Sequence, residues 1–108
     1  MSDEPKKSAP AQGLTLPHGL KLRIDEDVAQ GMYSNMQVVG SNETEFVLDF
    51  AYLPPNQRQG KVRSRVIISP KHAKGLLRLL SERVRDYEAR FGPIVLPDGQ
   101  RPGGNLIN

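Results

Sequence analysis

Residues 69–93 read SPKHAKGLLRLLSERVRDYEARFGP, and this stretch decides the shape of the domain. Ser69 is a favourable N-cap residue, and Pro70 suits the first helical position because its missing N–H is not needed there. Gly92 and Pro93 end the helix. Between these signals the apolar residues recur at helical spacing, at Ala73, Leu76, Leu77, Leu80, Val84, Tyr87 and Phe91. The stretch therefore predicts one amphipathic helix of about 22 residues.

Upstream of residue 69 the apolar residues alternate with polar ones, which is typical of strands with one buried face. We expect four strands, at residues 20–24, 32–39, 46–52 and 61–68, the second starting at residue 32 or 33. Their short connections predict an antiparallel meander. The expected fold class is therefore α+β, a four-stranded meander followed by one long helix (ββββα) that covers the apolar face of the sheet.

The two ends of the chain differ in composition from the middle. Residues 1–18 are rich in Pro, Ser, Ala and Lys, and residues 93–108 hold three prolines and three glycines. We expect both ends to be disordered, the second one mostly so, and residues 19–92 to form a single domain. A body of about 74 residues supplies only a few kcal/mol of core stabilisation. At roughly 33 Å, the helix is also longer than one short sheet needs. Both arguments predict a homodimer.

Composition excludes several classes of function. The chain has no cysteine, so it lacks disulfides and thiolate metal sites, and no segment is apolar over the roughly 20 residues that span a bilayer. Its first residues lead into no apolar signal region, so we expect a cytoplasmic protein with no membrane association. His18 and His72 are too few for a zinc site. We expect no catalytic residues, no metal and no cofactor, and hence no enzyme.

Charge is distributed unevenly along the chain. Residues 1–60 carry five basic and eight acidic side chains, whereas residues 61–91 carry nine basic and three acidic ones. Alternation places Lys61, Arg63 and Arg65 on one face of the last strand, and Lys21 and Arg23 extend it. Such a face suits a phosphate backbone, with Tyr33 as the candidate for base stacking. The competing interpretation is a solvated face, in which Glu45 or Asp49 pairs with Arg63 or Arg65 across the strands.

Several motifs together resemble those of one protein family. They are GMYSN at residues 31–35, EFVLDF at 45–50 and SRVIISPKHAK at 64–74, with Tyr87-Glu88 and FGPI at 91–94. The chain resembles a family of short bacterial and archaeal proteins classified as a domain of unknown function, over residues 22–95. The resemblance implies no activity. The polar residues of these motifs either form a binding surface or serve as caps and turns.

The expected order of elements is also similar, in topology only, to two groups of binding proteins. One repeat of the PUR and Whirly-type single-strand-binding proteins has the order ββββα, and the SecB-type export chaperones are more loosely similar. The first likeness implies a nucleic-acid ligand and the second a polypeptide. We therefore expect a small non-enzymatic binding module for single-stranded nucleic acid, with a protein-interaction or chaperone-like module as the alternative.

Overall fold

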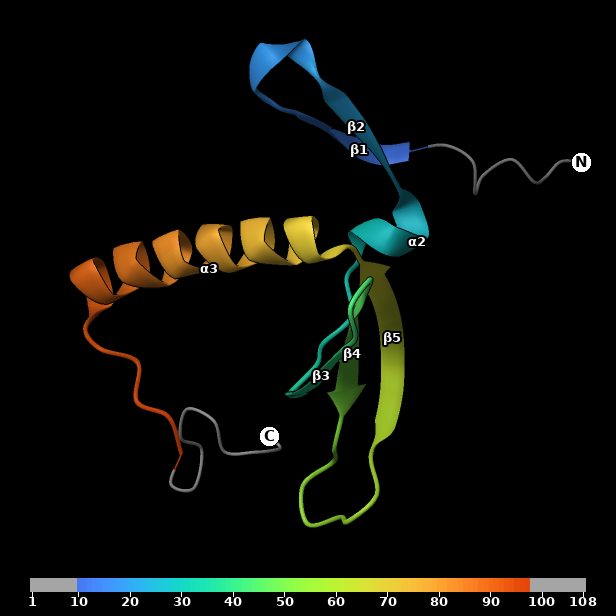
Figure 1. The fold of residues 1–108 in the computed structure, drawn as a ribbon, viewed down its shortest axis with the longest axis vertical. Helices are drawn as coiled ribbons and strands as arrows, with labels where there is room; N and C mark the ends of the chain where they lie inside the picture. The colour runs from blue at the N-terminus through green and yellow to red at the C-terminus, as the bar shows by residue number, and fades with distance from the viewer. Residues whose placement is uncertain (1–9, 98–108) are drawn as a thin grey trace, which may run out of the picture. The chain divides into compact units, whose positions relative to one another are not determined.

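The computed structural model describes residues 10–97 and shows an α+β chain in two compact units, the first ending at Tyr33 and the second beginning at Ser34 (Figure 1). The first unit holds β1 (Pro10–Thr15), the 3-10 turn η1 (Pro17–Gly19), β2 (Lys21–Asp25) and α2 (Glu26–Ala29). The second holds β3 (Met36–Ser41), β4 (Phe46–Tyr52), β5 (Lys61–Ile68) and α3 (Pro70–Phe91). Each unit is described by itself.

The first unit contains an antiparallel hairpin, and its strand β1 lies within residues 1–18, for which the composition predicts disorder. Leu14 lies opposite Leu22, and the Leu16 N–H donates to the Leu20 carbonyl oxygen at 2.7 Å. Between them η1 turns the chain with positive φ angles at His18 and Gly19. Leu14 and Leu16 alternate with polar or small residues as Leu20 and Leu22 do on the other side of the turn. The proline-rich composition of residues 1–18 hides this pattern. The disorder expected at residues 1–9 and 98–108 lies outside the described residues.

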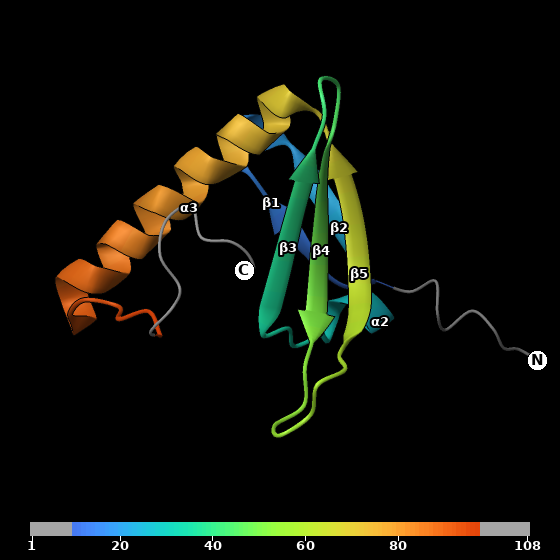
Figure 2. The same ribbon diagram turned by 60° about the horizontal axis from the view of Figure 1, so that its bottom comes forward.

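The second unit contains a three-stranded antiparallel sheet of order β3-β4-β5 (Figure 2). Its strands confirm the expected strands at 46–52 and 61–68, and β3 lies four residues later than the expected start of the second strand. The expected strand at 20–24 pairs with β1 and not with β3, so the described residues form two sheets rather than one four-stranded meander. β2 pairs with β1, its nearest neighbour in the sequence, because a short turn is enough to join two strands into a hairpin.

The long helix α3 confirms the expectation for residues 70–91. The His72 N–H donates to the Ser69 Oγ at 3.2 Å, which is the expected N-cap bond. At the other end Gly92 has a φ of 100°, and its N–H donates to the Glu88 carbonyl oxygen at 3.0 Å. The Ile94 N–H donates to the Glu88 carboxylate at 2.8 Å. Within residues 10–97, no helix has both the length and the apolar character needed to traverse a bilayer.

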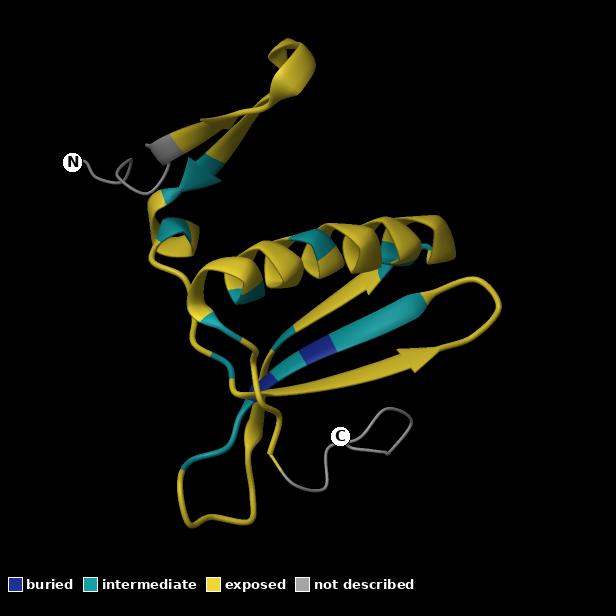
Figure 3. Ribbon diagram, turned by 90° about the vertical axis from the view of Figure 1, so that its left-hand side faces the viewer, coloured by how far each residue is buried: buried dark blue, intermediate teal, exposed yellow. Residues whose placement is uncertain are grey.

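Burial is confined to the central strand. Among residues with described side chains, the buried ones are Ala51 and Asp49, both on β4 (Figure 3). β4 is shielded because β3 and β5 flank it on both sides. The apolar side chains of α3 are exposed from Leu76 to Phe91, so the expectation that this helix covers the sheet is wrong for the single chain. Figure 2 shows α3 leading away from the end of β5.

Ser69→Ala should lower the free energy of unfolding by about 1 kcal/mol, because the helix loses the oxygen that accepts the His72 N–H. Ser69→Asp supplies another capping oxygen and should restore most of the loss. Urea unfolding of the three proteins measures both effects. An unchanged stability in Ser69→Ala would show that the cap contributes nothing.

Gly60→Ala should destabilise the sheet by about 1–3 kcal/mol. An added Cβ would lie 2.8 Å from the Tyr52 carbonyl oxygen, which belongs to the backbone and cannot turn away. Gly75→Ala is the matched control, since a Cβ there meets nothing within 4 Å. It should stabilise α3 by up to about 1 kcal/mol. Thermal or urea unfolding checks that the two changes have opposite signs.

Candidate functional site at the sheet and its edges

The basic residues of β5 do not share one face. Lys61 lies opposite Tyr52 and Arg65 lies opposite Asp49, three positions apart on β4 and therefore on opposite faces. The register shifts between Phe50 and Ala51, where β5 contains one extra residue, Arg63. Such a bulge reverses the direction of side chains on one side of it. The expectation that Lys61, Arg63 and Arg65 form one basic face is therefore wrong.

Arg65 forms a bidentate ion pair with Asp49. Its Nε donates to Oδ1 at 2.7 Å and its Nη2 donates to Oδ2 at 2.9 Å. This confirms the cross-strand pairing of Asp49 with Arg65. The hydrogen bonds from Arg65 hold the pKa of Asp49 below its ordinary value of 3.8, against the opposing effect of burial. Because Asp49 neutralises Arg65, this guanidinium offers little free charge to a phosphate.

The other predicted site residues lie in the first unit. Lys21 faces Thr15 across the hairpin, and Arg23 lies 3.8 Å from Asp25 in an exposed ion pair. Tyr33 precedes β3, lies on no strand and is 71% exposed. These three residues and the basic residues of β5 thus belong to separate units.

The polar residues of the sequence motifs serve as caps and turns. The Asn35 side chain forms two hydrogen bonds with the backbone of Leu53, as a neighbouring strand would. Its Nδ2 donates to the Leu53 carbonyl oxygen, and its Oδ1 accepts the Leu53 N–H, both at 2.9 Å. The Asn42 Oδ1 accepts the N–H groups of Thr44 and Glu45 at 2.9 Å, which fixes the turn between β3 and β4. Of the two interpretations of the motifs, these contacts favour the framework.

A serine and a histidine also meet at the start of α3. The Ser69 Oγ lies 3.1 Å from the His72 Nδ1. The same oxygen accepts the His72 N–H, so this contact is part of the helix cap. In the described part of the chain, no three His, Asp or Glu side chains gather into a group that could hold a metal ion. The contact gives no third group that would orient the histidine for catalysis.

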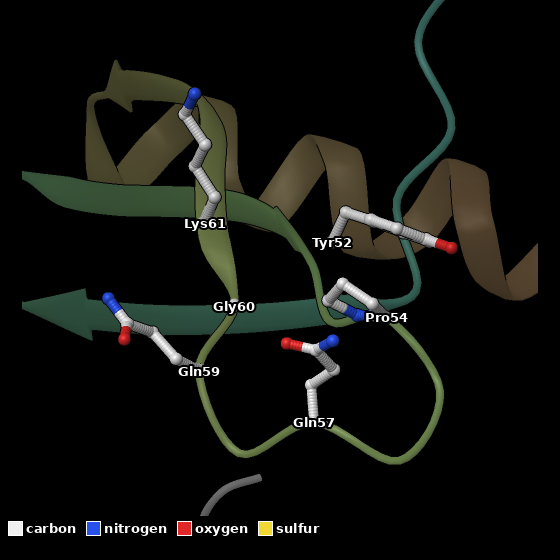
Figure 4. A pocket seen from close by; sticks show the side chains of 6 residues that line it. All are labelled: Tyr52, Pro54, Gln57, Gln59, Gly60 and Lys61. Carbon is white, nitrogen blue, oxygen red and sulfur yellow. The ribbon is translucent and has the colours of Figure 1, made fainter.

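A shallow pocket lies in the connection between β4 and β5. Its lining residues are Tyr52, Pro54, Gln57, Gln59, Gly60 and Lys61. Figure 4 shows that the Lys61 and Tyr52 side chains point in different directions and do not converge on one point. None of the lining residues is a carboxylate or a histidine. The pocket therefore brings together no acid–base pair of these types.

The two edges of the sheet differ in a way that sequence reasoning missed. β3 reads MQVVGS and has no charge and no proline, and its register with β4 is regular. β5 carries Lys61, Arg63 and Arg65 and contains the bulge. Charges and bulges are the features by which proteins prevent an edge strand from pairing with another chain. β5 has this protection and β3 lacks it, and the uncharged run at residues 36–41 is the signal in the sequence.

The chain belongs to the family described as "Protein of unknown function (DUF3467)", whose model matches residues 1–96. This match confirms the resemblance to a family of unknown function. The comparisons with curated proteins and with solved structures each give no significant match. The topological likeness to PUR, Whirly and SecB-type proteins rested on the order ββββα, and the two sheets of the described residues do not have this order.

The ion pair predicts how stability depends on pH. Ionised Asp49 stabilises the fold above the ordinary carboxyl pKa of 3.8, and this contribution is lost as the pH falls through the lower folded value. Asp49→Asn should therefore be less stable than the unmodified protein at about pH 6, and the difference should shrink towards about pH 2.5. Urea unfolding across this range measures it. Glu45→Gln, which removes an exposed carboxylate beside β4, is the control. An equal pH dependence in both variants would contradict the assignment.

Proposed function

We propose that this member of the DUF3467 family is a non-enzymatic protein-interaction module that works as a homodimer. Its partner is an extended polypeptide, which adds a strand to the open edge of β3. The observation that carries this proposal is the difference between the protected edge at β5 and the unprotected edge at β3.

The backbone of β3 supports strand addition. Within residues 10–97 β3 pairs only with β4, so every second N–H and C=O group along it is directed away from the sheet. The Asn42 N–H donates to the Glu45 carbonyl oxygen, which closes the hairpin and sets this alternation. An extended peptide gains main-chain hydrogen bonds when it pairs with such an edge.

The side chains around β3 set the chemistry of the partner. Val38 is 50% exposed and Val39 is 60% exposed, and they project to opposite faces of the sheet. Val39 lies beside Leu48, which lies beside Val66, so an apolar row crosses one face. A strand with apolar residues at alternate positions would extend this row and cover Val39. The expected partner is therefore an extended segment with apolar residues at alternate positions.

Single-stranded nucleic acid is the alternative ligand. The excess of basic residues between 61 and 91 favours it. Against it, Lys61 and Arg65 lie on opposite faces, and Asp49 neutralises Arg65. Lys21 and Arg23 belong to the other unit. These placements give the polypeptide the better support.

The homodimer is supported by exposed apolar surface. Apart from Ala51, no apolar side chain with a described position is buried, and the stripe of α3 is exposed from Leu76 to Phe91. Apolar surface of this extent marks interaction sites in soluble proteins. In a two-fold dimer both copies use the same surface, so a second copy can cover the exposed stripe of the first.

The proposal is tested with a short fluorescein-labelled peptide in which valine alternates with threonine. Fluorescence anisotropy should show binding to the full chain, and Val39→Lys should weaken it about tenfold or more because a lysine blocks the edge. Val66→Lys is the matched control: Val66 flanks the same Leu48 on the same face, but at the β5 edge. It should change the affinity by less than about threefold.

Two further measurements separate strand addition from other modes of binding. The same peptide with N-methyl groups at alternate residues keeps its side chains but loses main-chain donors, and it should not bind. Equal effects of the two lysine substitutions, or equal binding of both peptides, would refute the edge. If the peptide does not bind and labelled oligothymidine binds with a steep salt dependence, the ligand is nucleic acid and the polypeptide is refuted.

A further inference from the structure

Six of the apolar residues of α3 form a stripe of regular spacing, which Leu76 borders on one side. Ala73, Leu77, Leu80, Val84, Tyr87 and Phe91 are separated alternately by four and three residues, which is a heptad pattern over the whole helix. From Leu77 to Phe91 these side chains are between 41% and 68% exposed. A surface of this kind suits a second helix with the same spacing.

We propose that α3 pairs with α3 of a second copy in antiparallel orientation, with its centre near Glu82. This inference deepens the homodimer of the proposed function and rests on it. In this register, two residues of the stripe lie opposite each other when their residue numbers add up to about 164. This register is the only antiparallel one that uses the whole stripe, because a shift by one heptad leaves two residues at each end without an opposite.

The sizes of the side chains favour this orientation. Ala73, the smallest residue of the stripe, lies opposite the partner's Phe91, and Leu77 lies opposite the partner's Tyr87. At the centre Leu80 lies opposite the partner's Val84. Every layer thus combines a larger and a smaller side chain, so the two helix axes keep a uniform distance. A parallel pair would place Phe91 on Phe91 at one end and Ala73 on Ala73 at the other.

The flanking charges agree with the antiparallel pair. Lys74 and Glu88 border the stripe on the same side, and the antiparallel register brings Lys74 next to the partner's Glu88, twice per dimer. Arg83 meets its equivalent near the two-fold axis, where the ion pair of each copy with its own Asp86, at 3.6 Å, lowers the repulsion. The parallel pair would instead bring Arg83 next to the partner's Glu88. Charge therefore permits both orientations, and side-chain size decides between them.

Spin labels on exposed helix positions outside the stripe test the orientation. The chain has no cysteine, so Lys71→Cys and Arg85→Cys each give one labelled site, and both occupy the same heptad position. In the antiparallel dimer the two labels at residue 71 are separated along the axis by roughly 33 Å, and those at residue 85 by roughly 9 Å. In a parallel dimer the two distances are equal. Double electron–electron resonance measures them, and equal distances would overturn the proposal.

Light scattering on a seam variant distinguishes failure of this inference from failure of the homodimer. Leu80→Glu should raise the dimer dissociation constant about tenfold or more, since it places a charge at the centre of the seam. A dimer that persists in Leu80→Glu would place the interface elsewhere, which overturns the seam but leaves the homodimer. A mass near 12.0 kDa for the unmodified chain would overturn both. Helical circular dichroism of the variant checks that α3 still forms.

Discussion

The central strand β4 holds the second unit together. It is hydrogen-bonded on both sides, by β3 and by β5, and it carries Asp49 and Ala51, the two residues that are buried among those with described side chains. The bidentate bond from Arg65 to Asp49 joins β4 to β5 and satisfies a carboxylate that is only 8% exposed. A strand held in this way forms a sheet without a deep core, because backbone pairing and one ion pair set its register. Many apolar side chains of the sheet faces and of α3 are therefore exposed in the single chain.

The local features of this chain were predictable from its sequence, because they depend on neighbouring residues. Ser69, Pro70 and Gly92 delimit α3 in the sequence as they do in the structure. The alternation in residues 46–52 identifies β4 for the same reason. The bulge at Arg63 was not predictable, because residues 61–68 contain no glycine or proline that would mark it and a bulge depends on how β5 meets its neighbour. This one extra residue places Lys61 and Arg65 on opposite faces of the sheet, so the predicted basic face does not form.

The differences at the two ends of the domain have another origin. Composition alone assigned residues 1–18 to a disordered tail, whereas in the structure Leu14 and Leu16 match Leu22 and Leu20 across a turn. The stripe of α3 was assigned to the sheet, since an apolar stripe indicates that a helix is covered but not what covers it. The spacing by four and three residues contained the finer signal, because a heptad favours another helix over the flat face of a sheet.

The two proposed interfaces use different groups of the second unit. α3 follows β5 directly through Ser69, whereas β3 forms the other edge of the sheet. Strand addition uses the backbone groups of β3, and the helix pair uses the side chains of α3. The antiparallel dimer would carry one three-stranded sheet at each end of the helix pair, and thus two open β3 edges per dimer. A polypeptide long enough to reach both edges would bind the second one intramolecularly, which raises its overall affinity without any new contact.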